Sequence, residues 1–245
     1  MPSRSQVAPA DEARVRDAVV AAGRRLRSAG LIAAGEGNIS IRFGRGLLLI
    51  TPSGRRKDEL AADDLVVIAA RADPPSGSPA AEPRPSSDVA IHRAVYAARA
   101  DVSAVVHAHL PAAMSLTLAG VVPDPSVLPE TALLLPRLPF VPFAAAGSED
   151  LAGAIAAALA DGRSTKPGAA LLERHGAVAV GAGDDAAAAL RQAIDRLELV
   201  EVLCRTWRDA LIVRAAANAL GPGAILRPPD TAPGTPARGR RRRSQ

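Results

Sequence analysis

Cysteine and aromatic residues are scarce in this sequence of 245 residues. Cys204 is the only cysteine, which excludes an intrachain disulfide and agrees with a reducing cytoplasm as the expected location. Aromatic residues make up 2% of the chain, so alanine, valine, leucine and isoleucine have to build the core. No apolar run approaches the roughly 20 residues that span a bilayer, and charges interrupt residues 1–20, where a signal peptide would be apolar. We therefore expect a soluble globular protein without membrane insertion.

The net charge of +5 comes entirely from residues 221–245, which hold six arginines and one aspartate. This segment is rich in proline and arginine and has no apolar periodicity, so we predict a disordered tail. The predicted organisation is a disordered N-terminus over residues 1–10, one domain over 11–220, and the tail. Such a tail can touch RNA or anionic lipid nonspecifically. Because residues 1–220 are neutral overall, no specific nucleic-acid partner is expected.

Helix and strand signals are mixed along the predicted domain. Apolar periodicity predicts helices over residues 11–28, 88–98, 148–160 and 184–217, and Ser148 is placed to cap the third of them. Alternating or short apolar runs predict strands, and they are found in the segments 38–50 (a hairpin), 63–69, 101–109, 137–144 and 169–181. Residues 72–86 are predicted as a loop. Several strands follow one another without a helix between them, which favours an α/β domain with a largely antiparallel or mixed sheet.

Two histidines end the most apolar strand, in the segment "DVSAVVHAHLPAA". Alternate side chains of a strand point to the same face, so His107 and His109 are expected to stand side by side. Two neutral imidazoles there are costly for packing alone but form the start of a metal site. His175 in "ERHGA" offers a third ligand, although on its own residues it is predicted to be a hydrogen-bonded turn histidine. His92, with apolar neighbours at helical spacing, is predicted to be a packing residue.

Six segments occur in an order and spacing that resemble the class II aldolase/adducin family, whose members include fuculose-phosphate aldolase and ribulose-phosphate 4-epimerase. They are "GLIAAGEGNISIR", "LLITPSG", "PSSDVAIHRAVY", "AVVHAHLPAA", "FVPFAAAGSEDLA" and "LLERHGAVAVG". The resemblance implies a three-layer α/β/α fold, a symmetric homotetramer, and a zinc ion (or another divalent metal) bound by His107, His109 and His175. It also implies a group of residues around the phosphate of a sugar-phosphate substrate: Gly37, Asn38, Ser53, Gly54, Ser86 and Ser87.

The chemistry implied by the resemblance is retro-aldol cleavage of a phosphorylated ketose, with a zinc-stabilised enediolate and a carboxylate that moves the proton. Asp88 stands where the family's aldolases have glutamate and its epimerases have aspartate. Glu130 is a second candidate carboxylate. The only lysines, Lys57 and Lys166, lie in polar loops and are not expected to have depressed pKa values, so a Schiff base is not expected.

Other functions remain open at this stage. The same site would serve a sugar-phosphate 4-epimerase, a decarboxylase or a dehydratase. A non-catalytic interaction protein like adducin, which lacks the metal ligands, is disfavoured because all three histidines are present here. The only tyrosine, Tyr96, stands where the family has a packing residue, so it is not expected to serve as the acid that protonates the leaving fragment.

Overall fold

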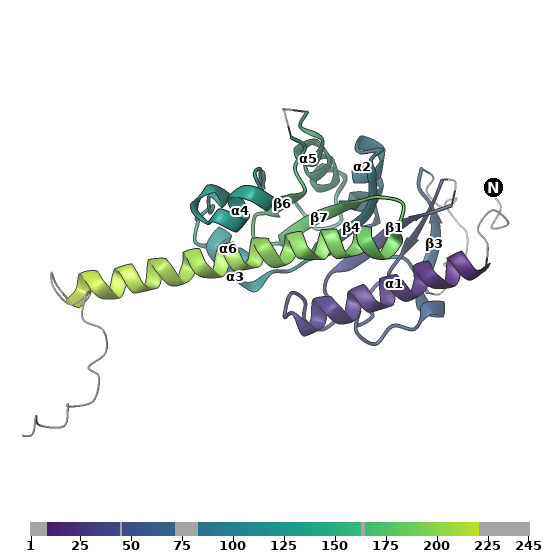
Figure 1. Ribbon diagram of the computed structural model, residues 1–245, viewed down its shortest axis with the longest axis horizontal. Coiled ribbons are helices and arrows are strands. Elements are labelled where there is room, and N and C mark those ends of the chain that lie inside the picture. Colours follow the sequence, from purple (N-terminus) through teal and green to yellow (C-terminus); the bar gives the residue numbers. More distant parts are fainter. Residues whose placement is uncertain (1–8, 45, 72–82, 163–164, 221–245) are drawn as a thin grey trace, which may run out of the picture. The chain divides into compact units, whose positions relative to one another are not determined.

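The computed structural model describes residues 9–44, 46–71, 83–162 and 165–220 (Figure 1). The chain divides into two units, residues 1–207 and 208–245. The predicted tail over residues 221–245, residues 1–8 of the predicted disordered N-terminus, and most of the predicted loop over 72–86 lie outside the described residues. The predicted domain boundary at residue 220 therefore stays a prediction. Everything that follows on the sheet and the site concerns the first unit.

Seven strands form a single sheet in the order β3-β2-β1-β4-β7-β6-β5. The strands are β1 (Asn38–Phe43), β2 (Leu47–Ile50), β3 (Val66–Ala69), β4 (Val102–Ala108), β5 (Phe140–Val141), β6 (Ala169–Leu172) and β7 (Gly176–Ala182). Neighbouring strands are antiparallel except for β5 and β6, which pair in parallel. The prediction of a mixed, largely antiparallel sheet is confirmed.

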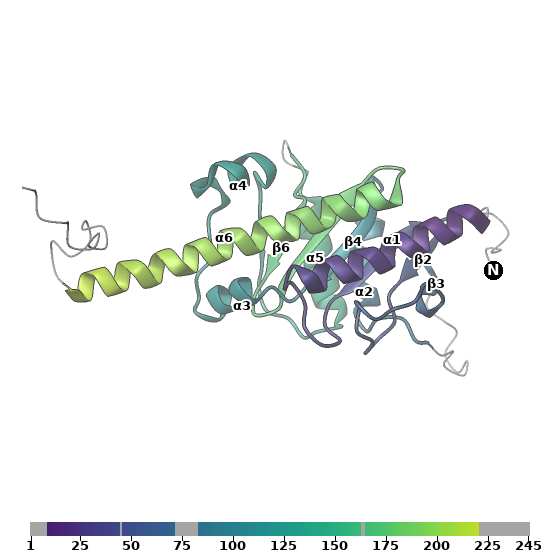
Figure 2. The ribbon, with the colours of Figure 1, turned by 60° about the horizontal axis from the view of Figure 1, so that its bottom comes forward.

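Helices cover both faces of the sheet (Figures 1 and 2). They are α1 (Pro9–Ser28), α2 (Val89–Ala98), α3 (Pro111–Leu118), α4 (Pro129–Leu134), α5 (Glu149–Ala160) and α6 (Ala186–Leu220), with 3-10 turns η2 (Ala62–Asp64) and η3 (Pro125–Val127). In the first unit, α1 and the beginning of α6 cross one face of the sheet, and α2 and α5 cover the other. This is the expected three-layer arrangement.

One hydrophobic core cluster lies between the sheet and the helices α2 and α5. Nearly all its members are aliphatic, as the shortage of aromatics requires: Ile91 and Val95 of α2 and Ile155 of α5 belong to it with Val105 and Val178 of the central strands. Ser148 caps α5 as predicted, because its Oγ accepts a hydrogen bond from the N–H of Leu151 (3.1 Å). In the described part of the chain, no helix is long and apolar enough to cross a membrane.

Two short helices, α3 and α4, were not predicted from the sequence. Each begins with a proline, Pro111 and Pro129. In the sequence, Pro111 predicts only the end of a strand. It also fits the start of a helix, because a proline in the first turn loses no intrahelical hydrogen bond and has a suitable φ. The chain after the two histidines therefore turns directly into a helix. This places His109 between the end of β4 and the start of α3.

Candidate metal centre and active site

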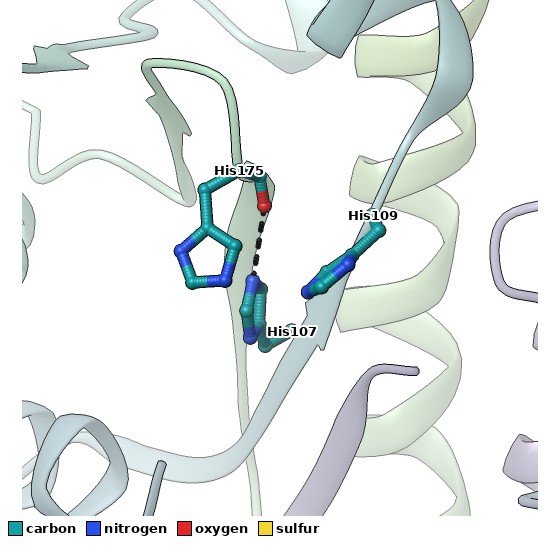
Figure 3. A group of neighbouring side chains, drawn as sticks. All are labelled: His107, His109 and His175. Carbon is teal, nitrogen blue, oxygen red and sulfur yellow. Dashed lines mark hydrogen bonds between the residues drawn. The ribbon is translucent and has the colours of Figure 1, made fainter. Parts of the chain in front are cut away.

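Three histidines from two distant parts of the chain come together at the ends of β4 and β6 (Figure 3). The ring centroids of His107, His109 and His175 are 4.7 to 4.9 Å apart, and one nitrogen of each ring lies within 4.8 Å of the others. Tetrahedral zinc with nitrogen ligands at about 2.1 Å has its ligand atoms about 3.4 Å apart. Small rotations of the rings would bring the three nitrogens to this shorter spacing, so the cluster could hold a metal ion.

The register of the sheet fixes the position of His107. His107 lies opposite Asn38 of β1 and opposite Val178 of β7, so it is held on both sides by strands. His109 follows the strand and precedes α3. Glu201 of α6 binds the first turn of α3 through hydrogen bonds. The buried Glu201 carboxylate accepts hydrogen bonds from the N–H groups of Ala112 (3.1 Å) and Ala113 (3.3 Å). A carboxylate from a distant helix thus holds the segment that carries His109.

His175 reaches the pair because the turn between β6 and β7 approaches β4 very closely. At Gly176 (φ +87°), a Cβ atom would lie 2.1 Å from the carbonyl oxygen of Ala108 and 2.8 Å from the Cα of His109. Arg174, on the other side of His175, also has a positive φ of 58°, which is uncommon for a residue with a side chain. Only glycine fits at position 176, and this contact brings the third histidine to the first two.

Burial keeps His109 and His175 neutral, which is the state in which an imidazole binds a metal. Loss of hydration lowers the pKa of His109 and that of His175 to about 4. The carboxylate of Glu36 lies 3.7 Å from Nδ1 of His109. His107 is fully buried, and its Nε2 lies 3.2 Å from the carbonyl oxygen of His175. The chemistry of the donor set, three imidazole rings at one point, therefore fits a divalent metal such as Zn²⁺.

Asp88 lies directly beside the histidine cluster. It occupies the N-cap position of α2, but its side chain makes no capping hydrogen bond. Its Oδ2 accepts instead from Nδ2 of Asn38 (2.8 Å) and faces Nδ1 of His107 (3.2 Å). The hydrogen bond with His107, above all, holds the pKa of this buried carboxyl well below its usual range, so Asp88 is ionised. With a carboxylate on its Nδ1, His107 could bind a metal through Nε2 if the ring turned away from the carbonyl oxygen of His175.

The residues expected around a phosphate lie on segments that pair with one another. The N–H of Ser53 donates to the carbonyl of Arg84 (2.9 Å), and the N–H of Ser86 donates to the carbonyl of Thr51 (3.1 Å). These bonds bring Ser53 and Gly54 to the two serines before Asp88. Ser53, Gly54 and Ser87 are exposed, whereas Ser86 is buried and its Oγ accepts from the N–H of Asp88 (3.3 Å).

The glycine-rich segment before β1 joins the same group. A Cβ on Gly35 would lie 3.2 Å from the carbonyl oxygen of Gly54, and a Cβ on Gly37 (φ +70°) would lie 2.9 Å from the carbonyl oxygen of His107. The Asn38 side chain is buried, with Nδ2 on Asp88 and Oδ1 on His92. All six residues of the expected phosphate group therefore lie around Asp88 and the histidines. Their role in binding phosphate stays a proposal.

Lys57 is buried, and this contradicts the expectation that it lies in a polar loop. Only 2% of the residue is exposed, and its Nζ donates to the carbonyls of Gly35 (2.7 Å) and Arg55 (2.6 Å). Burial lowers the pKa of Lys57 to about 8, against the opposing effect of the Asp88 charge. Both of its acceptors belong to backbone segments that flank Gly54 and Gly37. Lys57 therefore ties together the two loops that are expected to surround the phosphate.

We predict that Lys57→Met destabilises the protein by at least about 2 kcal/mol, because two buried carbonyl oxygens lose their partner. For a chain of this size, the melting temperature should fall by about 4 to 8 °C. Differential scanning calorimetry measures the change. Lys166→Met is the matched control: Lys166 is half-exposed and forms a surface ion pair with Asp101 (3.4 Å), so its loss should shift melting little. Equal melting of the two variants would contradict the structural role of Lys57.

Glu130, the second candidate carboxylate, lies away from these contacts. It is exposed in the first turn of α4, and among the described residues it forms no hydrogen bond or ion pair. Its catalytic role stays a prediction, and no observed contact of Glu130 supports that role. Asp88, by contrast, is bound on one side by Asn38 and on the other by His107. The observed arrangement thus favours Asp88 as the carboxylate that works beside the metal ligands.

Burial confirms the predicted packing of His92 and Tyr96, which are 0% and 4% exposed. The sequence did not predict that both also form hydrogen bonds with Ser40. The sequence spacing indicates this network. His92 and Tyr96 are four residues apart and lie on one face of a helix, and Asn38 and Ser40 are two residues apart and lie on one face of a strand. Two matching polar stripes on elements that pack together predict a buried polar network.

The chain belongs to the class II aldolase and adducin family: residues 17–208 match the class II aldolase and adducin N-terminal domain. It is 34% identical over 170 residues to 5-deoxy-D-ribulose 1-phosphate aldolase of Bacillus thuringiensis, which covers 67% of this chain and 73% of that protein. It is 38% identical over 100 residues to methylthioribulose-1-phosphate dehydratase of Gluconacetobacter diazotrophicus, covering 41% of this chain and 47% of that protein.

The fold is also similar to that of solved aldolases. The crystal structure of L-fuculose-1-phosphate aldolase from Thermus thermophilus superimposes with a TM-score of 0.71. It is 29% identical in sequence, and the match covers 84% of this chain and 98% of that one. The family resemblance inferred from the sequence motifs is confirmed, and so is the fold class.

The depressed histidine pKa values predict an acid-sensitive fold. In the unfolded chain these groups titrate near 6.5, whereas burial lowers the pKa of His92 to about 3 and those of His109 and His175 to about 4. Between pH 6.5 and 4 the unfolded chain therefore binds more protons, so the free energy of unfolding falls as the pH falls. We expect a lower urea midpoint at pH 5 than at pH 7 in metal-free protein.

The matched variant for this pH dependence is His175→Asn, which removes one of the depressed groups and should weaken the dependence on pH. A midpoint that is equal or higher at pH 5 in the parent protein would contradict the burial of neutral imidazoles.

Proposed function

We propose that this protein is a metal-dependent lyase that cleaves a 5-deoxyketopentose 1-phosphate by retro-aldol chemistry. The observation that carries the proposal is the convergence of His107, His109 and His175 beside the ionised carboxylate of Asp88. The phosphorylated substrate is suggested by the aldolase relative, whose match covers two thirds of this chain. The zinc ion, the homotetramer and the cytoplasmic location expected from the resemblance belong to this proposal as well.

The three histidines would hold the metal, which supplies Lewis-acid stabilisation of negative charge on the substrate carbonyl when it is bound. Cleavage of the bond between C3 and C4 removes a proton from the C4 hydroxyl and adds one to C3. Asp88 is ionised and acts only as a hydrogen-bond acceptor. It can therefore take the proton of the C4 hydroxyl and return it to C3. The products are dihydroxyacetone phosphate and acetaldehyde.

Binding of the phosphate is assigned to the turn at Ser53 and Gly54 and to Ser86 and Ser87. The exposed hydroxyls of Ser53 and Ser87 and the backbone at Gly54 (φ +68°) can approach an anion without crowding it. Ser86 and Ser87 directly precede Asp88 at the start of α2, so phosphate bound there would place the sugar carbons toward the histidines. The Lys57 ammonium adds positive charge nearby, since it holds the loop next to Gly54.

Dehydration is the second candidate function, because a methylthioribulose-1-phosphate dehydratase matches 41% of the chain at 38% identity. In that reaction Asp88 would take the proton from C3, and the C4 hydroxyl would leave as water. The proposed metal ligands and phosphate group would be the same. The two reactions differ in their products: two fragments for the aldolase, and one phosphorylated diketone for the dehydratase.

The test is product analysis after incubating the zinc-loaded protein with 5-deoxyribulose 1-phosphate. Formation of dihydroxyacetone phosphate and acetaldehyde in equal amounts supports the proposal. The unphosphorylated sugar is the control, and it should be turned over far more slowly because it lacks the phosphate. A phosphorylated diketone as the product would replace the aldolase by the dehydratase. No turnover of either kind would contradict both.

A further inference from the structure

We propose that His92 is a positioning residue for Asp88: it holds the Asn38 amide in the one orientation that donates to the Asp88 carboxylate. His92 touches neither the three clustered histidines nor the serines assigned to phosphate. This proposal rests on the proposed function, in which Asp88 carries the proton. The geometry of the contacts is independent of which substrate is bound.

A continuous chain of hydrogen bonds leads from Asp88 into the core. Nδ2 of Asn38 donates to Asp88 (2.8 Å), and Oδ1 of the same amide lies 2.6 Å from Nε2 of His92. Nδ1 of His92 lies 2.6 Å from Oγ of Ser40, which lies 3.0 Å from the hydroxyl of Tyr96. The strand β1 supplies Asn38 and Ser40, the helix α2 supplies His92 and Tyr96, and Asp88 is the N-cap residue of that helix.

The Asn38 amide sets the direction of this chain. Its Nδ2 donates to Asp88, so its Oδ1 is the group that faces His92 and can only accept a hydrogen bond. His92 must then carry its proton on Nε2, and Nδ1 accepts from the Ser40 hydroxyl. At the far end, the Tyr96 hydroxyl has an acceptor in the carbonyl of Ser103 (3.2 Å). If the Asn38 amide turned over, its oxygen would face the carboxylate and the bond to Asp88 would be lost.

Burial makes the arrangement rigid. His92 and Ser40 are 0% exposed, Asn38 is 3% exposed and Tyr96 is 4% exposed, so water does not replace a lost partner. Loss of hydration keeps His92 neutral, which is the only state in which Nδ1 can accept from Ser40.

The test compares two polar replacements of the same residue. In His92→Gln the longer amide reaches the place of Nε2 and can still donate to Asn38. In His92→Asn the shorter amide reaches only the place of Nδ1, on the side of Ser40. We expect kcat to fall about tenfold or more in His92→Asn, with KM changed little, and to recover to within about threefold in His92→Gln, since groups that orient an active-site residue typically contribute 10- to 100-fold.

Val95→Ala is the control for lost stability, because Val95 is a fully buried core residue of the same helix with no part in the chain of hydrogen bonds. It should lower the melting temperature and leave kcat unchanged. Equal kcat in His92→Asn and His92→Gln, or a loss of kcat in Val95→Ala as large as in His92→Asn, would overturn the proposal.

A crystal structure of His92→Asn supplies a readout that does not depend on activity. We expect the Asn38 amide to turn or Asp88 to move, so that Nδ2 of Asn38 no longer lies within hydrogen-bond distance of Asp88. An unchanged bond would overturn the positioning role. If the parent protein turns over no sugar phosphate, the proposed function fails, and this structure still decides the role of His92.

Discussion

Replacing Asp88 by asparagine is expected to lower kcat for the phosphorylated ketose at least about a hundredfold, the usual effect of losing a general acid or base. Asparagine keeps an oxygen that can accept from Nδ1 of His107 but cannot take or give a proton. The metal content should therefore survive, and the melting temperature should change little. Steady-state kinetics, metal analysis and calorimetry on the same preparation measure the three quantities.

Glu130→Gln is the companion variant. Because Glu130 is exposed in α4 without a bonded partner in the described part of the chain, we expect its replacement to change kcat much less than that of Asp88. If Asp88→Asn keeps turnover within a few-fold of the parent protein while Glu130→Gln loses it, Glu130 is the proton carrier and the assignment to Asp88 is wrong.

Removal of the metal is expected to lower turnover by about a thousandfold or more, because the metal is the proposed Lewis acid for the negative charge left when the C3–C4 bond breaks. The chelator should act without unfolding the protein, since strands β1, β4 and β7 already hold His107 and Asn38 in register. Kinetics after dialysis against a chelator, with circular dichroism on the same sample, measure both effects.

Addition of Zn²⁺ should restore turnover in the parent protein but not in His109→Ala, which lacks one of the three proposed ligands. Full activity in protein shown by elemental analysis to hold no metal would contradict the metal-dependent mechanism.

Periodicity and residue types predicted most of the sheet and the pair His107 and His109, and the family resemblance added His175 to the cluster. The alternation in "AVVHAH" placed His107 and His109 on one side, and the motif around His175 supplied the third ring. These predictions succeeded because strand geometry fixes which side chains share a face. The short helices α3 and α4 were not predicted, because six to eight residues show little periodicity. Only the proline at the start of each helix indicates it in the sequence.

Contacts between distant segments could not be predicted in the same way. Lys57 stands in the polar run "SGRRKDEL", and nothing in that run indicates that its ammonium is covered by the loop at Gly35. Glu201 is equally inconspicuous in α6, although it holds the start of α3. Whether a polar residue is exposed or buried in such places depends on which segment packs over it, and that is a property of the folded chain.

The central claim is that His107, His109 and His175 bind one divalent metal beside Asp88. Anomalous diffraction at the zinc absorption edge, from crystals of the zinc-loaded protein, tests it most directly. We predict one strong peak per chain, about 2.0 to 2.1 Å from one nitrogen of each of the three rings. A peak at any other place, or none at the three histidines, would contradict the account.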